Sequence, residues 1–479
     1  MPVLLFTAVL ALAYGYEVFS FGLTLDEELY GELDNAEYAA KWVEQGRWAM
    51  SLLILAVPSP VVPVVSAGLG VGLSGVGWWL LSRGHLGLGP WQSAAVCSLA
   101  ATIPVLAFMY SFSTIAFGIG VGTLLLVAYA WGVSSRSWTY RGLGMFAGAA
   151  AIGIYDSFLV AMVALALGFV FARPRLFTAV VGFGSAVAAL LVSRVFAGFA
   201  NVVTNVPAGA YISHFLSWES LTEDPGALLA EAQLNTAEVL FLSEVRFGLH
   251  SPWLAVVIIS LSLLAIYSAL LPDVSVGERA WRCAAVAGLL LLPFGATVAA
   301  PLMPLRSMLY LPIVTLVLAA AALRGTRYFD PGLRRTAAPV AAGLIILAVI
   351  GNATISNRLF ASAQTAYAQD QQLAFQIGLE KDKLQGGDQM ADLPMVLSGP
   401  HPLPESRLRP ERETLGVSFF DWDNRNKRAG AFLRANGVKV HDPTPEQVAQ
   451  ARPVLATMPP YPLDGWVQVD NGVLLVKFR

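Results

Sequence analysis

Long apolar runs recur along the chain as far as about residue 352. A helix needs ~20 apolar residues to cross a bilayer. We therefore expect about eleven membrane-spanning helices, at residues 2–23, 60–82, 90–110, 112–133, 142–155, 157–172, 176–198, 252–271, 283–303, 308–323 and 336–352. The runs at 142–155 and 157–172 are short, and they predict either a tight helical hairpin or one broken span.

The segments between and after these runs have other patterns. Residues 36–47 place apolar and charged side chains at helical spacing, which favours a helix on the membrane surface, and residues 49–57 predict a second interfacial or re-entrant helix. The last part of the chain reads as a small α/β domain. We expect strands at 395–398, 416–420 and 438–440, helices at 426–435 and 445–457, and a hairpin over 466–478 around Asn471-Gly472.

Composition supports a membrane protein with one soluble domain. Hydrophobic residues make up 56% of the 479 residues and charged residues 13%, about half the share in soluble domains. Charged residues are about twice as dense after Asn352 as before it. We therefore predict a transmembrane domain at 1–351, with outer loops at 24–48 and 199–251, and an α/β domain outside the membrane at 352–479.

Arginine in the short connections predicts the orientation. With the N-terminus in the cytoplasm, five connections fall on the cytoplasmic side, and each carries arginine. These residues are Arg83, Arg136, Arg141, Arg173, Arg175, Arg279, Arg282, Arg324, Arg327, Arg334 and Arg335. Both long loops and the C-terminal domain then lie outside the membrane, which in a bacterium is the periplasmic side of the cytoplasmic (inner) membrane.

Several function classes are excluded by what the sequence lacks. No basic stripe with interleaved aromatic residues indicates a nucleic-acid partner. No P-loop, zinc motif, nucleophile elbow or dinucleotide fingerprint stands in a suitable context. The chain also has no cytoplasmic domain that could hold a sugar nucleotide, so a donor for group transfer would have to arrive through the membrane.

Acidic residues give the first candidates for chemistry. Asp26, Glu27 and Glu28 follow the first run directly and could abstract a proton or hold a divalent cation, or they could form a solvated loop face. Asp156 is the one acidic residue between Trp48 and Trp218. A carboxylate within a span is costly and indicates function, unless it occupies a turn at the outer boundary.

Cationic residues on the predicted outer side are the second candidates. Arg306 departs from the arginine distribution of the other spans and could bind a phosphate, or extend to the interface as a long side chain does. Arg194 is a weaker case of the same kind. Arg47 could pair with the acids or bind a phosphate. His214, alone in an outer loop, is better read as an ordinary loop residue than as a catalyst.

These stretches together resemble the GT-C superfamily of membrane glycosyltransferases, and more closely the type-II Gtr family of O-antigen glucosyltransferases of bacteria and their phages. The resemblance is carried by LDEELYGELDNAEYAAKWVEQGRW, GIYDSFL, LRSMLYLP, NRLFASAQTAYAQDQQLA, GVSFFDWDNRNKRAGAFLRANG and the closing TPEQVAQARPVLATMPPYP and GVLLVKF. Three features differ from the family pattern. Asp26-Glu27 replaces an Asp-Asp pair, a basic residue after that pair is missing, and Asp156 replaces a glutamine.

The resemblance implies a fold, partners and a mechanism. A polyprenyl-phosphate hexose would be the donor, a lipid-linked or cell-surface glycan such as O-antigen the acceptor, and Asp26 the general base of an inverting transfer. Arg306, with Arg47, would neutralise the leaving phosphate, and Glu27 and Asp156 would orient the acceptor or the sugar.

We also expect Tyr155, Glu28 and Arg194 to be among the substrate-binding residues. No cofactor is required by the sequence, and assistance by a divalent cation stays open.

Two other functions remain open on the sequence. A transporter or flippase for a lipid-linked sugar would have a similar membrane part, although transporters usually show two related halves and acids deep in several spans. A non-catalytic assembly protein that binds cell-wall polymer would retain its role without Asp26.

Overall fold

The computed structural model describes residues 1–479 except 21, 58–63, 210–221, 272–274, 302, 327–328, 386–391, 405, 407–408 and 423–424. Helices make up 72% of it, and a small sheet lies near the C-terminus, which confirms the predicted mainly α class. The chain forms two compact units. The first contains Met1–Phe19 and Asn35–Asn357, and the second contains Ser20–Asp34 and Arg358–Arg479.

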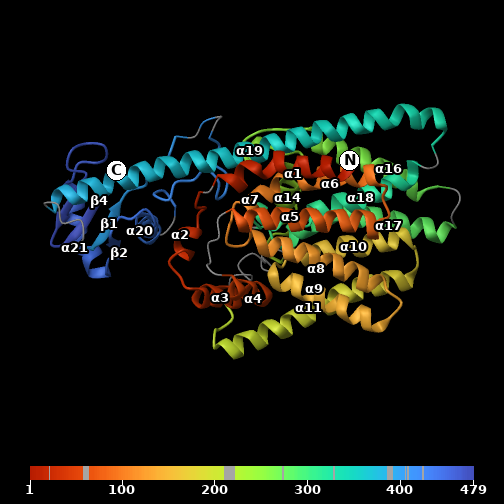
Figure 1. Cartoon of the computed structure of the whole chain (residues 1–479), viewed down its shortest axis with the longest axis horizontal. Coiled ribbons are helices and arrows are strands. Elements are labelled where there is room, and N and C mark those ends of the chain that lie inside the picture. Colours follow the sequence, from red (N-terminus) through yellow and green to blue (C-terminus); the bar gives the residue numbers. More distant parts are fainter. Residues whose placement is uncertain are drawn as a thin grey trace. The chain divides into compact units, whose positions relative to one another are not determined.

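The first unit is a bundle of helices (Figure 1). Its early helices are α1 (Pro2–Phe19), α3 (Asn35–Glu44), α4 (Trp48–Ala56), α5 (Val65–Leu80), the π-helix η1 (Leu81–His85), α6 (Pro90–Ala101), the 3₁₀-helix η2 (Pro104–Leu106), α7 (Ala107–Tyr110), α8 (Ala116–Ser134) and α9 (Trp138–Ile154). The later helices are α10 (Phe158–Ala172), α11 (Leu176–Thr204), α14 (Pro225–Leu240), α15 (Glu244–Phe247), α16 (Trp253–Ala269), α17 (Val276–Ala299), the 3₁₀-helix η3 (Leu305–Ser307) and α18 (Leu311–Gly325). The long helix α19 (Pro331–Leu384) begins in this unit.

Small residues let the bundle helices approach closely. A Cβ added to Gly132 of α8 would lie 2.5 Å from the Cα of Gly144 on α9, and one added to Gly70 of α5 would lie 2.3 Å from the carbonyl oxygen of Ala116 on α8. Such contacts replace the hydrophobic drive that is absent between helices in lipid. The three helices α5, α8 and α9 therefore pack nearly backbone to backbone.

Apolar helices in the described part of the chain make this a membrane protein. Six of them are long and apolar enough to cross a bilayer, and α6 with the helical segment Pro104–Tyr110 makes a seventh if that pair, bent by 57°, is one span. The bend follows Thr102, whose hydroxyl bonds back to the carbonyls of Ser98 and Leu99, and it precedes Pro104, which cannot continue a helix. Helices α10, α16 and α18 are apolar but shorter, so the expected eleven spans and their orientation stay predictions. The runs at 142–155 and 157–172 correspond to two separate helices, α9 and α10.

The second unit is an α/β domain. Its elements are α2 (Glu27–Tyr30), β1 (Leu393–Ser398), α20 (Arg425–Ala435), β2 (Val440–His441), α21 (Pro445–Thr457), β3 (Val467–Asp470) and β4 (Val473–Lys477). The strand order is β2-β1-β4-β3, with β1 parallel to β2 and β4, and with β3 antiparallel to β4. The expected hairpin is present, and Asn471 and Gly472 have the positive φ values that a two-residue turn needs.

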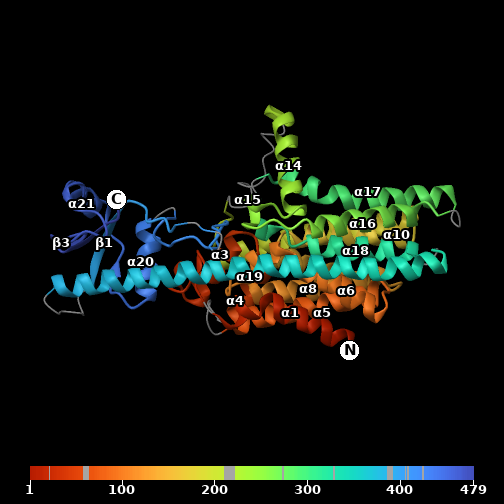
Figure 2. The ribbon, with the colours of Figure 1, turned by 90° about the horizontal axis from the view of Figure 1, so that it is seen from above.

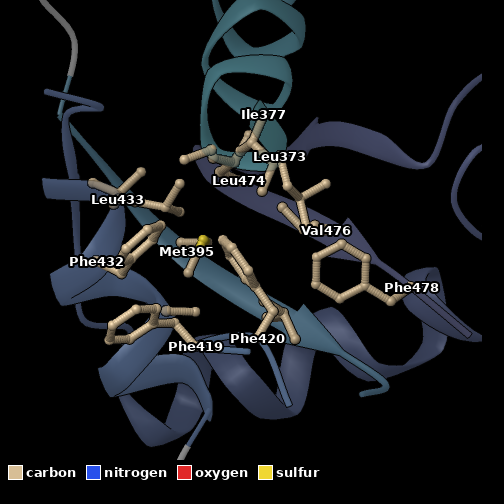
Figure 3. Close-up of a cluster of buried hydrophobic side chains, with 14 of the residues drawn as sticks. Leu373, Ile377, Met395, Phe419, Phe420, Phe432, Leu433, Leu474, Val476 and Phe478 are labelled. Carbon is tan, nitrogen blue, oxygen red and sulfur yellow. The ribbon is translucent and has the colours of Figure 1, made fainter. Parts of the chain in front are cut away.

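Aromatic side chains fill the core of this unit. Phe419, Phe420 and Phe432 lie around Met395 of β1, and Leu373 and Ile377 of α19 cover them together with β4 (Figure 3). The strand expected at 416–420 is wrong, because this segment contains no strand and ends in a turn at residues 419–420. The backbone N–H of Phe419 donates to Asp370 on α19 at 2.8 Å, as does the hydroxyl of Ser418, so this part of the segment bonds to a buried carboxylate rather than to a strand.

Candidate functional site

The acid-bearing loop is part of the second unit. The sequence prediction assigned residues 24–48 to the membrane domain, whereas residues 20–34 pack with the C-terminal part of the chain. The cause is Leu25, which is 2% exposed and belongs to the aromatic core described above. Burial of Leu25 fixes its neighbour Asp26, which has a φ of +89° at the start of the short helix α2. Non-glycine residues rarely adopt that conformation, and such strain is often found at functional sites.

One arginine of α20 joins two of the three acids. Arg428 donates through Nη2 to Oδ1 of Asp26 at 2.6 Å and through Nη1 to Oε1 of Glu28 at 2.5 Å. Six residues further along α20, Arg434 donates to both carboxylate oxygens of Glu32. The planar fork of arginine suits this bridging of carboxylates. Both arginines therefore fasten the acid loop to α20.

The three neighbouring acids differ in burial. Glu28 is fully buried, and burial raises its pKa to about 7 although the charge of Arg428 opposes that shift. Its Oε2 atom has no hydrogen-bond partner among the described residues. Glu27 is also buried, and its carboxylate accepts the N–H of Thr24 at 3.1 Å. The side chain of Asp26 is 30% exposed, so of these three acids Asp26 alone presents its carboxylate to a substrate.

A second polar cluster lies in the first unit. Asp156, in the turn between α9 and α10, pairs with Nη2 of Arg194 at 3.0 Å and lies 3.6 Å from Nε of Arg47. The guanidinium carbon of Arg47 lies 4.3 Å from the ring centre of Tyr155 and 5.3 Å from that of Trp42. The Arg47 side chain is 9% exposed and that of Arg194 46%. The cluster thus joins one buried and one accessible cation through a shared carboxylate.

The late arginine of the sequence prediction is connected to this cluster through its neighbour. The Tyr155 hydroxyl is 3.1 Å from Oγ of Ser307, which follows Arg306 in η3. Arg306 is partly buried, and its guanidinium carbon lies 5.8 Å from the ring centre of Phe112. The structure therefore brings Arg47, Tyr155, Asp156 and Arg194 together. Arg306 directly precedes Ser307, the residue that contacts Tyr155.

Some expected features lie elsewhere or outside the description. Asp26, Glu27 and Glu28 belong to the second unit, and the arginine cluster belongs to the first. His214 falls outside the described residues. Within the described ranges no group of three or more His, Cys, Asp or Glu side chains could hold a metal ion.

Sequence reasoning missed two residues, Arg428 and Ser307. Both lie in stretches that carried the family resemblance. The signal available for Arg428 was its position, with Arg434, on a short helix that otherwise supplies core residues.

The apolar helices and the polar clusters define an integral membrane protein with candidate polar sites in each unit. Residues 18–177 match the family model described as Glucosyl transferase GtrII. This match confirms the resemblance to the type-II Gtr family and supports a glycosyltransferase. Asp26, Arg47 and Asp156 fall inside the matched range, whereas Arg306 and Arg428 fall outside it. A comparison with curated proteins found no match.

Proposed function

We propose that this protein transfers a hexose, with glucose as the first candidate, from a polyprenyl-phosphate sugar to a glycan. The acceptor would be a lipid-linked or cell-surface glycan such as the O-antigen of lipopolysaccharide, and the reaction would take place at the outer face of the bacterial cytoplasmic membrane. The match to a glucosyl transferase family supports the sugar and the reaction class. The observation that carries the proposal is the accessible Asp26 carboxylate, held by Arg428.

Asp26 is the general base in this proposal. Arg428 occupies Oδ1 at 2.6 Å, which fixes the orientation of the carboxylate and leaves Oδ2 to accept a proton from the acceptor hydroxyl. As that hydroxyl oxygen forms its bond to the anomeric carbon, the bond from that carbon to the phosphate breaks, and the configuration inverts. Glu28 and Glu27 are too buried to contact the acceptor, so they shape the loop around Asp26.

The first unit contains cations that suit a phosphate group. Negative charge builds up on the phosphate as the glycosidic bond breaks, and preorganised cations stabilise such charge most. Arg194 offers an accessible guanidinium, and Asp156 holds it at 3.0 Å. Arg47 and Arg306 supply further cations that belong to the same unit. Asp156 would be displaced in part by the phosphate, or would orient the sugar.

Transfer from a labelled lipid tests the proposal. Membranes containing the protein would receive a labelled polyprenyl-phosphate hexose and a lipid-linked glycan acceptor. Asp26→Asn keeps the size of the side chain but removes the base, so we expect label in the glycan to fall by about a hundredfold or more. Glu32→Gln is the matched control, because it removes another arginine-bound carboxylate of the same loop and should keep transfer near the wild-type rate.

Two outcomes would count against this reading. Equal transfer by wild type and Asp26→Asn would mean that another residue is the general base, and Asp156 would be the next candidate. Absence of transfer by the wild type with any hexose lipid would favour a flippase for the same lipids, which needs no base.

A further inference from the structure

A pocket of about 510 Å³ lies in the second unit, where α19 meets the turn that follows α20. Helix α20 lies against the last part of α19 in Figure 2. The turn comes close to α19 at Gly378, where an added Cβ would lie 3.2 Å from Cγ2 of Val438. The volume lies within the range of small-molecule sites. The lining includes Gln371, Phe375, Lys381, Asp382, Asn436 and Lys439.

A lysine is buried in the wall of this pocket. Ala374 and Ile377 belong to the stripe of α19 that covers the domain core, and Lys381 continues this stripe one turn after Ile377. Lys381 is 1% exposed, although lysine is almost never fully buried unless it is paired. Within the described part of the chain, its ammonium group has no hydrogen-bond or ion-pair partner. A negatively charged group in the pocket would supply that partner.

A purely structural role does not account for this lysine. A lysine that only covers apolar surface keeps its ammonium group in water, as Lys383 does with a side chain that is 69% exposed. An apolar residue at position 381 would fill the buried stripe without the cost of burying a charge. The described lining also carries two lysines against one acid, Asp382. The burial of Lys381 beside a pocket therefore points to an anionic ligand.

Other lining residues suit a sugar ring. Phe375 is 67% exposed and lies one turn after Gln371 on α19. The face of an exposed aromatic ring attracts the C–H groups that form the apolar face of a pyranose. Nε2 of Gln371 donates to Oδ1 of Asn436 at 3.1 Å, which orients the two amides. An amide has two N–H donors and an acceptor oxygen, so Gln371 can also bind sugar hydroxyls.

We propose that this pocket binds a hexuronic acid unit of a glycan. The carboxylate of the sugar pairs with Lys381, and the apolar face of its ring packs on Phe375. Its hydroxyls bond to the amide of Gln371. The acceptor of the proposed transfer is the source of this glycan, so the inference rests on the proposed function in that respect. The described lining contains none of the residues assigned to transfer, so binding can be tested by itself.

Binding of a hexuronic acid trisaccharide to the full-length protein in a neutral detergent tests the pocket. We expect calorimetry to show tighter binding of trigalacturonate than of maltotriose, a neutral trisaccharide. Lys381→Met replaces the ammonium group with an apolar chain of similar length, so it should weaken trigalacturonate binding by about tenfold or more. Lys383→Met is the matched control, because it removes the same charge from the same helix outside the pocket, and it should bind like the wild type.

A second pair of variants tests the contact with the ring. Phe375→Ala removes an exposed side chain, so the protein should fold, but trigalacturonate should bind more weakly. Leu384→Ala removes an exposed apolar side chain at the end of α19, outside the pocket, and should bind like the wild type. Phe375→Ala also keeps the proposal testable if Lys381→Met does not fold.

The outcomes separate this inference from the proposed function. Unchanged trigalacturonate binding in Lys381→Met and Phe375→Ala would overturn the pocket as the site, and equal binding of maltotriose would overturn the carboxylate as the group recognised. Displacement of trigalacturonate by an equal concentration of inorganic phosphate would assign the site to an anion without a sugar. Binding without transfer would count against the proposed function alone, whereas transfer without trigalacturonate binding would count against the pocket alone.

Discussion

At the scale of single residues, Arg428 bridges two carboxylates that differ in burial. It contacts Asp26, which is 30% exposed, and Glu28, which is fully buried. Burial would lower the pKa of Arg428, but its two carboxylate partners outweigh that effect and raise the pKa. Removing the arginine would leave Glu28 buried without a cation, which typically costs about 3–5 kcal/mol. The same contact orients the proposed base, so stability and chemistry share one residue.

The raised pKa of Glu28 predicts how stability depends on pH. Burial raises the pKa of Glu28 to about 7 in the folded protein, whereas the pKa of an exposed glutamate in the unfolded chain is about 4.5. Stability contributed by this group therefore falls as pH rises from about 4.5 to 7 and levels off above that. At about 1.4 kcal/mol per pKa unit, the loss is at most on the order of 3 kcal/mol. Thermal unfolding of wild type and Glu28→Gln between pH 5 and 8 measures it.

The two proteins are compared by how steeply their free energy of unfolding changes with pH, because Glu28→Gln also removes the charge that faces Arg428. We expect the wild type to lose stability relative to Glu28→Gln as pH rises through this window. Glu32→Gln keeps Glu28 and should retain the wild-type slope. A wild-type slope in Glu28→Gln would assign the pH dependence to another group, such as the buried Asp370, whose pKa burial also raises to about 7.

At the scale of elements, glycine positions decide how closely the bundle helices pack. We predict that Gly132→Ala lowers stability by several kcal/mol, because its Cβ would lie 2.5 Å from the backbone of Gly144 and the two helices would have to separate. Gly142→Ala is the matched control on α9, since no atom lies within 4 Å of its added Cβ. That change should be neutral or stabilise by up to about 1 kcal/mol. Thermal unfolding in detergent distinguishes the two variants, and equal effects would contradict the close packing of α8 on α9.

Elements that depend on local sequence could be predicted, and those that depend on distant contacts could not. Thr444 begins α21 through a capping box with Gln447, and Asn471-Gly472 forms its turn, because each signal lies within a few residues. The segment 416–420 has a strand-like composition, but its bonds to Asp370 come from a helix some 48 residues away. The bridge from Arg428 to Asp26 spans 402 residues, so no local pattern indicates it.

At the scale of the whole molecule, the chain divides differently from the change in composition. Charge density changes near Asn352, and the compact units divide α19 between Asn357 and Arg358. Residues 20–34 join the C-terminal unit although they lie near the beginning of the chain. Composition detects where the long apolar runs end, but it cannot show which loop packs with the C-terminal unit. The candidate acids were therefore predictable as residues, whereas their partners required the fold.

The orientation of the chain in the membrane can be tested by chemical labelling. The arginine distribution predicts that the connection around Arg136 and Arg141 lies in the cytoplasm and that the C-terminal domain lies outside. Thr139→Cys and Leu463→Cys would put single thiols at exposed positions of these two regions, after Cys97 and Cys283 have been replaced by serine. A maleimide that cannot cross the cytoplasmic membrane should label Leu463→Cys in cells with a permeabilised outer membrane. Thr139→Cys should react only after the cytoplasmic membrane is broken. The reverse pattern would place Asp26 with the C-terminal unit in the cytoplasm, where a lipid-linked donor with an external head group could not reach it, and the proposed transfer would then need a different donor.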